Sequence, residues 1–269
     1  MRIGWLSTGR DQAAGNLLAD VVARAQHDEL PLDIGAVFCD REFGETPESD
    51  AFLKLVQRLG FHTVTLSSAA SWAAAQAQGA DRVRWRQDFH RRVFELLKPY
   101  RLDVLVMAGY MLIVSPELCR RFVLLNLHPA LPNGPTGTWQ DVIWALLEQE
   151  ATETGAMMHL ATAELDRGPV VSFFRFAITG GDWDPLWEQF RQKRRTMGVA
   201  QIAAAEGEQE PLFAEIRRRG EVREIPLLYQ TLRQFTLGQL NTAAGAVFAE
   251  STRLPLDLTA LVEEELARR

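Results

Sequence analysis

The sequence predicts an α/β fold in which a mostly parallel sheet is flanked by helices in a Rossmann-like arrangement. The first 130 residues alternate short apolar segments with longer amphipathic ones, which is typical of successive βαβ units. The segment 102–108 is almost wholly apolar, as expected of a strand that is covered on both faces. A chain of 269 residues is long enough for one large domain with a small appendage.

The elements of this first part follow one another in a regular order. Apolar segments predict strands at 2–6, 33–39, 62–66, 102–108 and 123–126, and helical periodicity predicts helices at 16–26, 50–59 and 87–97. Ser115 followed by Pro116 is typical of a helix N-cap with proline in the first turn. Right-handed crossovers between such strands produce a parallel sheet.

The pattern changes in the second half of the chain. The segments 155–161 and 170–178 are strand-like and too close for a helical crossover, so we expect them to pair antiparallel. Helices are expected at 184–197, 225–237 and 258–267, and the run 217–219 of three arginines is interpreted as a solvated helix end. Because the composition becomes charged and irregular from residue 198, we place a catalytic domain at 1–197 and a helical C-terminal extension at 198–269.

Charge and cysteine usage narrow the class of protein. The net charge of −6 disfavours non-specific nucleic-acid binding, which needs a basic surface. Cys39 and Cys119 form no C-x-x-C pair, so neither a zinc site nor a redox motif is indicated, and both are expected to be free thiols. The N-terminus lacks the features of a signal peptide, and no apolar run reaches membrane-spanning length. We therefore expect a cytoplasmic protein without a metal, nucleic-acid partner or membrane partner.

The strongest local motif is the segment 126–132, which reads Asn-Leu-His-Pro-Ala-Leu-Pro. It begins at the carboxyl end of a predicted parallel strand, where open α/β sheets bind ligands. Asn126 and His128 are two residues apart, so in an extended segment they project to the same side. The alternative is that both side chains only satisfy local backbone groups, and these residues alone do not decide between the two.

The second motif is the segment 165–170, Leu-Asp-Arg-Gly-Pro-Val. Asp166 stands just before a Gly-Pro turn, where a carboxylate by itself is most simply interpreted as part of an Asx-turn.

Taken together, the two motifs resemble those of the folate-dependent formyltransferases, and the phosphoribosylglycinamide formyltransferase branch most closely. The likeness covers roughly residues 1–185 and includes the segment 106–111 (Val-Met-Ala-Gly-Tyr-Met), Ser115-Pro116, Thr154-Gly155 and His159. It implies a formyltransferase fold and 10-formyltetrahydrofolate as co-substrate. It also implies the primary amine of a small metabolite as the acceptor, with glycinamide ribonucleotide among the candidates.

The resemblance also implies roles for individual residues. Asn126 and His128 would donate to the formyl oxygen as it becomes negative, and Asp166 would orient His128 and accept the proton of the amine. The pterin ring would be held by backbone groups of Met111, Leu112, Val114, Ala161, Thr162, Glu164 and Leu165. The acceptor would be held by Gly9, Gly15 and Asn16 at a helix N-terminus, which suits a phosphate, and by Arg86.

Several alternatives stay open at this point. Asp11 in the first loop would repel a phosphate, and the loop after His128 differs from the pattern usual in the family. A formyltetrahydrofolate hydrolase, an amino-sugar N-formyltransferase and a folate-binding relative without turnover are the competing functions. We interpret His159 as a supporting residue, and His27, His62 and His90 as surface residues. The oligomeric state is open, with a homodimer among the options.

Overall fold

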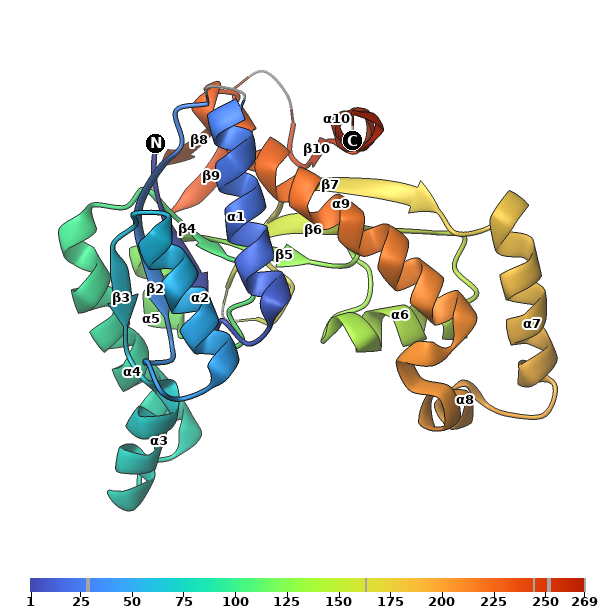
Figure 1. Ribbon diagram of the computed structural model, residues 1–269, viewed down its shortest axis with the longest axis horizontal. Helices are drawn as coiled ribbons and strands as arrows, with labels where there is room; N and C mark the ends of the chain where they lie inside the picture. Colours follow the sequence, from blue (N-terminus) through green and yellow to red (C-terminus); the bar gives the residue numbers. More distant parts are fainter. Residues whose placement is uncertain (28–29, 163, 244, 251–252, 269) are drawn as a thin grey trace. The chain divides into compact units, whose positions relative to one another are not determined.

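The computed structural model describes residues 1–27, 30–162, 164–243, 245–250 and 253–268 (Figure 1). The chain forms two compact units, and both are built from separate stretches of sequence. Unit 1 comprises residues 1–126, 160–169 and 232–253, and unit 2 comprises residues 127–159, 170–231 and 254–269. Three of the described elements cross between the units, namely strand β5 (Val123–His128), strand β6 (Glu153–Leu160) at its last residue, and helix α9 (Pro211–Thr236).

Unit 1 contains a parallel sheet in the order β5-β4-β1-β2-β3. Its strands are β1 (Arg2–Ser7), β2 (Asp33–Cys39), β3 (Thr63–Thr65), β4 (Val104–Met107) and the first part of β5. Its helices are α1 (Gln12–His27), α2 (Pro47–Arg58), α3 (Ser68–Ala77), α4 (Arg82–Leu97) and α5 (Pro116–Arg121). The short 3-10 helix η1 (Lys98–Tyr100) and the hairpin of β8 (Leu240–Ala243) and β9 (Ala246–Ala249) complete it.

Helices cover both faces of this sheet, as the unbroken apolar strands require. On one face, α4 contributes Trp85, Phe89, Val93 and Leu97 to a core cluster shared with α5 and with β1, β2, β4 and β5. Helices α1 and α2 lie side by side and bury their own apolar stripes (Figure 1). The predicted α/β class, with a mostly parallel sheet flanked by helices, is therefore confirmed.

Unit 2 is built around the antiparallel pair β6 (Glu153–Leu160) and β7 (Val170–Ala177), as predicted. The short strand β10 (Leu256–Asp257) adds to β7 in parallel. The helices are α6 (Trp139–Glu148), α7 (Asp184–Arg194), α8 (Val199–Glu206), most of α9, and α10 (Thr259–Ala267), with the 3-10 helices η2 (Gly181–Trp183) and η3 (Gly207–Gln209). A cluster of buried aromatic and aliphatic side chains joins α6, α7, α8 and the start of α9.

The arginine run at 217–219 corrects one prediction. Arg217 lies over the ring of Trp139 at 4.6 Å, and Arg219 lies over that of Trp183 at 4.5 Å. Arg217 also forms an ion pair of 2.7 Å with Glu224. Only Arg218 is exposed as expected, where it pairs with Glu215. The run is therefore part of the packing of α9 against its neighbours in unit 2, because arginine stacks well on aromatic faces.

Helix boundaries account for most of the remaining differences. Helix α1 begins at Gln12 rather than at residue 16, and α9 begins at Pro211 rather than near residue 225. Helices α3, α6 and α8 were not predicted. The division at residue 197, which rests on a change in composition, stays a prediction.

Candidate active site

The carboxyl ends of β1, β4 and β5 lie next to one another in unit 1. In the parallel registers Leu6 is opposite Met107, and Met107 is opposite Asn126. Asn126 is half-buried at this edge, as expected for a residue in a ligand-binding crevice of an open α/β sheet.

Strand β5 continues from Asn126 to His128, its last residue. The His128 side chain is only 3% exposed. Its Nε2 lies 2.8 Å from the carbonyl oxygen of Pro135, and its ring lies 6.2 Å from that of His159 in an edge-on arrangement. His159 is also buried, which is consistent with the supporting role predicted for it.

The contact with Pro135 restricts what His128 can do. A carbonyl oxygen only accepts, so Nε2 must carry the hydrogen in this contact. In the neutral ring Nδ1 is then an acceptor, and a donor on Nδ1 exists only in the imidazolium. With the Pro135 contact intact, His128 can thus donate to a formyl oxygen only as a cation.

Asp166 lies in the loop between β6 and β7, in a region that belongs to unit 1. It is half-buried and has the left-handed φ of 53°, which aspartate tolerates better than most residues. The loop is closed by the bond from Leu160 N–H to Pro169 O at 2.9 Å. A Cβ at Gly168 would lie 1.7 Å from the carbonyl oxygen of Leu160, so only glycine fits there.

The three residues predicted to be catalytic are therefore divided between the units. Asn126 and Asp166 belong to unit 1, and His128 belongs to unit 2. The structure places each of these residues locally, and the meeting of the carboxylate of Asp166 with the imidazole of His128 stays a prediction.

The residues predicted to hold the pterin ring come from two loops of unit 1. The first follows β4, where Tyr110 and Val114 are buried, Leu112 is half-buried, and Met111 and Ile113 are exposed. The second contains Ala161, whose N–H donates to the carbonyl oxygen of Leu124 in β5 at 2.8 Å. Ala161 and Leu112 pack against the same core cluster. Of the other predicted residues, Thr162 is half-buried, and Glu164 and Leu165 are exposed.

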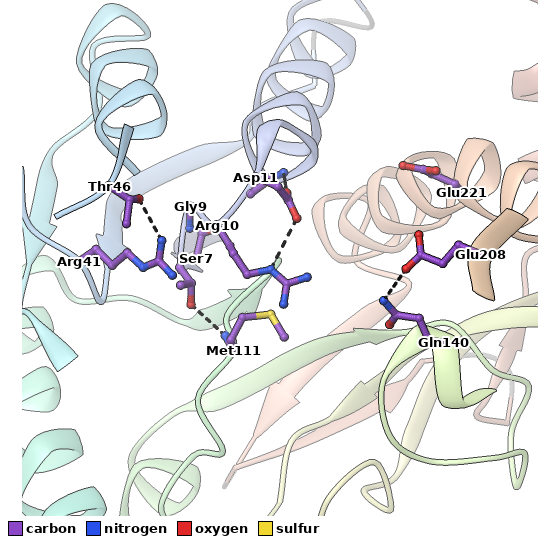
Figure 2. A network of polar contacts seen from close by, with 12 residues as sticks. Ser7, Gly9, Arg10, Asp11, Arg41, Thr46, Met111, Gln140, Glu208 and Glu221 are labelled. Carbon is purple, nitrogen blue, oxygen red and sulfur yellow. Dashed lines mark hydrogen bonds and ion pairs between the residues drawn. The ribbon is translucent and has the colours of Figure 1, made fainter. Parts of the chain in front are cut away.

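The predicted acceptor loop is shorter than the sequence suggested. Because α1 begins at Gln12, Gly15 and Asn16 lie inside the helix, and only Gly9 remains in the loop. The Oδ1 of Asp11 accepts from the N–H of Ala14 at 3.1 Å, so the side chain of Asp11 already caps this helix. Arg10 lies beside Asp11 with an N–O distance of 3.8 Å (Figure 2).

Unit 1 contains two further arginines of interest, Arg41 and Arg86. Arg41 donates to the hydroxyl of Thr46 at 3.0 Å just beyond the end of β2 (Figure 2). Arg86 is half-buried in the second turn of α4, one turn before the buried His90. Its role in binding the acceptor stays a prediction.

Two buried polar residues below this edge, His90 and Asp40, were not identified from the sequence. His90 is 1% exposed, which corrects its interpretation as a surface residue, whereas His27 and His62 are exposed as predicted. Burial lowers the pKa of His90 to about 4. Asp40 is 2% exposed at the end of β2, and burial raises the pKa of its carboxyl group. The spacing of His90, Val93 and Leu97 is the signal that could have placed His90 on the buried face of α4.

Both cysteines are free thiols, as predicted, and burial raises the pKa of Cys39 to about 12. Among the described residues, no helix is long and apolar enough to cross a membrane. The described part of the chain also contains no group of three or more His, Cys, Asp or Glu side chains arranged to hold a metal ion.

Comparison with known proteins decides the family. The sequence pattern of the formyl transferase family matches residues 48–191, more than half of the chain. The chain belongs to the formyl transferase family. This confirms the resemblance to the formyltransferase family inferred from the two motifs.

Individual family members show the extent of the likeness. Phosphoribosylglycinamide formyltransferase of Escherichia coli is 28% identical over 173 residues, which cover 62% of this chain and 71% of that protein. The enzyme of the same name from Mycobacterium tuberculosis is 34% identical over 105 residues, which cover 38% of this chain and 48% of that protein. The matched part thus spans only about half the length of some of these relatives.

Solved structures of family members support the fold. Glycinamide ribonucleotide transformylase 1 from Symbiobacterium toebii aligns over 93% of both chains with a TM-score of 0.61 and 22% identity. A formyltetrahydrofolate deformylase from Pseudomonas syringae aligns over 92% of this chain and 65% of that chain, with a TM-score of 0.59 and 18% identity. At these identities the likeness shows a formyltransferase fold.

Proposed function

We propose that this protein transfers the formyl group of 10-formyltetrahydrofolate to the primary amine of a small metabolite. Membership of the formyl transferase family, together with Asn126 and His128 on strand β5, carries the proposal. The names of the relatives make glycinamide ribonucleotide the first acceptor to test. The proposal includes a cytoplasmic location and no nucleic-acid partner, for which the two free cysteines and the net charge of −6 are the supporting observations.

The reaction needs a neutral amine, a polarised formyl group and a proton acceptor. The amine nitrogen attacks the formyl carbon, the bond from that carbon to the folate nitrogen breaks, and tetrahydrofolate leaves with a proton. In the proposal, the amide of Asn126 and the cationic ring of His128 donate to the formyl oxygen as negative charge develops on it. Removal of one such donor costs about 100- to 1000-fold in rate. Asp166 accepts the proton that the attacking amine loses and passes it to the folate nitrogen as tetrahydrofolate leaves.

A panel of amines tests this function. The protein is incubated with 10-formyltetrahydrofolate and one amine at a time, including glycinamide ribonucleotide and amino sugars, and formylated products are identified by mass spectrometry. We expect tetrahydrofolate to form only with a suitable amine, and in equal amount with the formylated product of that amine. Release of formate at the same rate with and without any amine would instead show a hydrolase.

A further inference from the structure

The loop after β4 is held in place by polar contacts with buried residues. These residues have no direct part in the proposed reaction. On one side, the N–H of Thr8 donates to the carbonyl oxygen of Gly109 at 3.0 Å. The hydroxyl of Thr8 accepts from the N–H of Met111, also at 3.0 Å. The single residue that follows β1 therefore fixes two backbone groups of this loop.

On the other side, His90 of α4 makes two contacts with the same loop. Its Nδ1 accepts from the N–H of Ser115 at 3.1 Å, and its Nε2 lies 3.2 Å from the hydroxyl of Tyr110. Because a backbone N–H can only donate, Nδ1 must be unprotonated, and the hydrogen of the ring is on Nε2. The imidazole is thus neutral and bridges the first and last parts of the loop.

These contacts are buried, so their loss would cost free energy. Thr8 is 4% exposed, His90 is 1% exposed and Tyr110 is 7% exposed. A buried N–H that loses its acceptor pays the full desolvation penalty, so the loop would have to move to find water. Between the held positions, Met111 and Ile113 present exposed apolar side chains, 52% and 43% exposed respectively.

We propose that Thr8 and His90 are positioning residues that hold the loop 109–115 in the conformation that binds the folate. This inference rests on the proposed function, because that function makes the loop part of the folate site. Neither residue touches the formyl group in this account. Each acts through the backbone of Met111 or through Tyr110 and Ser115.

The test removes the polar contacts of one residue at a time. His90→Leu removes both ring contacts, and His90→Asn keeps an acceptor near the position of Nδ1. Thr8→Val removes the hydroxyl, and Thr8→Ser keeps it. Val93→Ala is the matched control, because Val93 is fully buried three residues further along α4 in the same core cluster and makes no polar contact with the loop. Should His90→Leu fail to fold, Tyr110→Phe removes only the hydroxyl.

Two measurements are made on each variant. Hydrogen exchange of the amides of 109–115 reports the order of the loop, and quenching of tryptophan fluorescence by tetrahydrofolate reports folate affinity. We expect His90→Leu and Thr8→Val to speed exchange and to weaken tetrahydrofolate binding about five- to tenfold, the effect of losing a buried hydrogen bond. The KM for 10-formyltetrahydrofolate should rise by the same factor, with a smaller change in kcat. His90→Asn and Thr8→Ser should restore most of the affinity.

Unchanged exchange in the loop, or faster exchange with wild-type folate affinity, would overturn the positioning role. Equal weakening in Val93→Ala would also overturn it, because the effect would then follow stability alone. Failure of the wild-type protein to consume 10-formyltetrahydrofolate while it binds tetrahydrofolate would overturn the proposed function and leave the positioning role standing. In nuclear magnetic resonance spectra, His90 should show the neutral ring with its hydrogen on Nε2, and a hydrogen on Nδ1 would contradict the arrangement.

Discussion

At the scale of single residues, the site depends on positions where only one type of side chain fits. Gly168 is the clearest case, because a Cβ there would lie 1.7 Å from the carbonyl oxygen of Leu160. Asp166, two residues earlier, has a φ of 53°. The sequence placed both residues in a turn, but it could not show that the turn is closed against β6, because that approach depends on tertiary structure.

Gly168→Ala should therefore damage the loop that carries Asp166. We expect a loss of about 1–3 kcal/mol in the free energy of unfolding, the usual cost of forcing an atom into filled space. Turnover of 10-formyltetrahydrofolate should fall with it, since the carboxylate is displaced. Urea unfolding and a folate assay on the same preparation check both effects. Wild-type stability in the variant would show that the close approach does not exist.

His90 makes stability depend on pH. Its pKa is about 4 in the folded protein, because burial disfavours the cation, and about 6.5 in an unfolded chain. The unfolded state therefore binds more protons between these values, and the contribution of neutral His90 is complete above pH 6.5 and is lost as the pH falls to 4. Over that interval the loss amounts to about 3 kcal/mol.

Comparison with His90→Asn isolates this effect from that of other titrating groups such as Asp40. The stability advantage of the wild-type protein over the variant, measured by urea unfolding, should shrink as the pH is lowered from 7.5 to 4.5. An advantage that stays constant over this range would mean that His90 is not buried as a neutral ring.

At the scale of elements, the sequence predicted strands better than helix boundaries. All five strands of the parallel sheet were placed within a few residues, because buried parallel strands are short and almost wholly apolar. Helix α1 starts four residues early because Asp11 caps it, and α3 was missed because none of its residues is buried. A helix without a buried stripe leaves no apolar periodicity for the sequence to show.

In helix α9 we expect a substitution that raises the free energy of unfolding rather than lowering it. Gly220 lies inside this helix, and a Cβ built on it meets no atom within 4 Å. Gly220→Ala should raise the free energy of unfolding by about 1 kcal/mol, because glycine is the poorer helix former. A higher melting temperature with unchanged folate turnover is the expected result. A lower one would mean that α9 is not continuous through residue 220.

At the scale of the whole molecule, the sequence predicted the fold class and the family, and local structure supports part of the site. The motif around Asn126 lies at the carboxyl edge of a parallel sheet, as predicted. The chain passes from one unit to the other between Asn126 and His128, and Asp166 belongs to the first unit. No pattern in the sequence could show this division, because each unit combines segments that are distant along the chain.

The role of Asp166 is best measured by the turnover of 10-formyltetrahydrofolate in the Asp166→Asn variant, with the best amine from the panel. We expect a loss of about 100-fold or more, because the variant can no longer accept the proton of the amine. Asp88→Asn, which removes an exposed carboxylate from α4, should retain wild-type turnover. Undiminished turnover in a folded Asp166→Asn protein would contradict the claim that this carboxylate acts with Asn126 and His128 in formyl transfer.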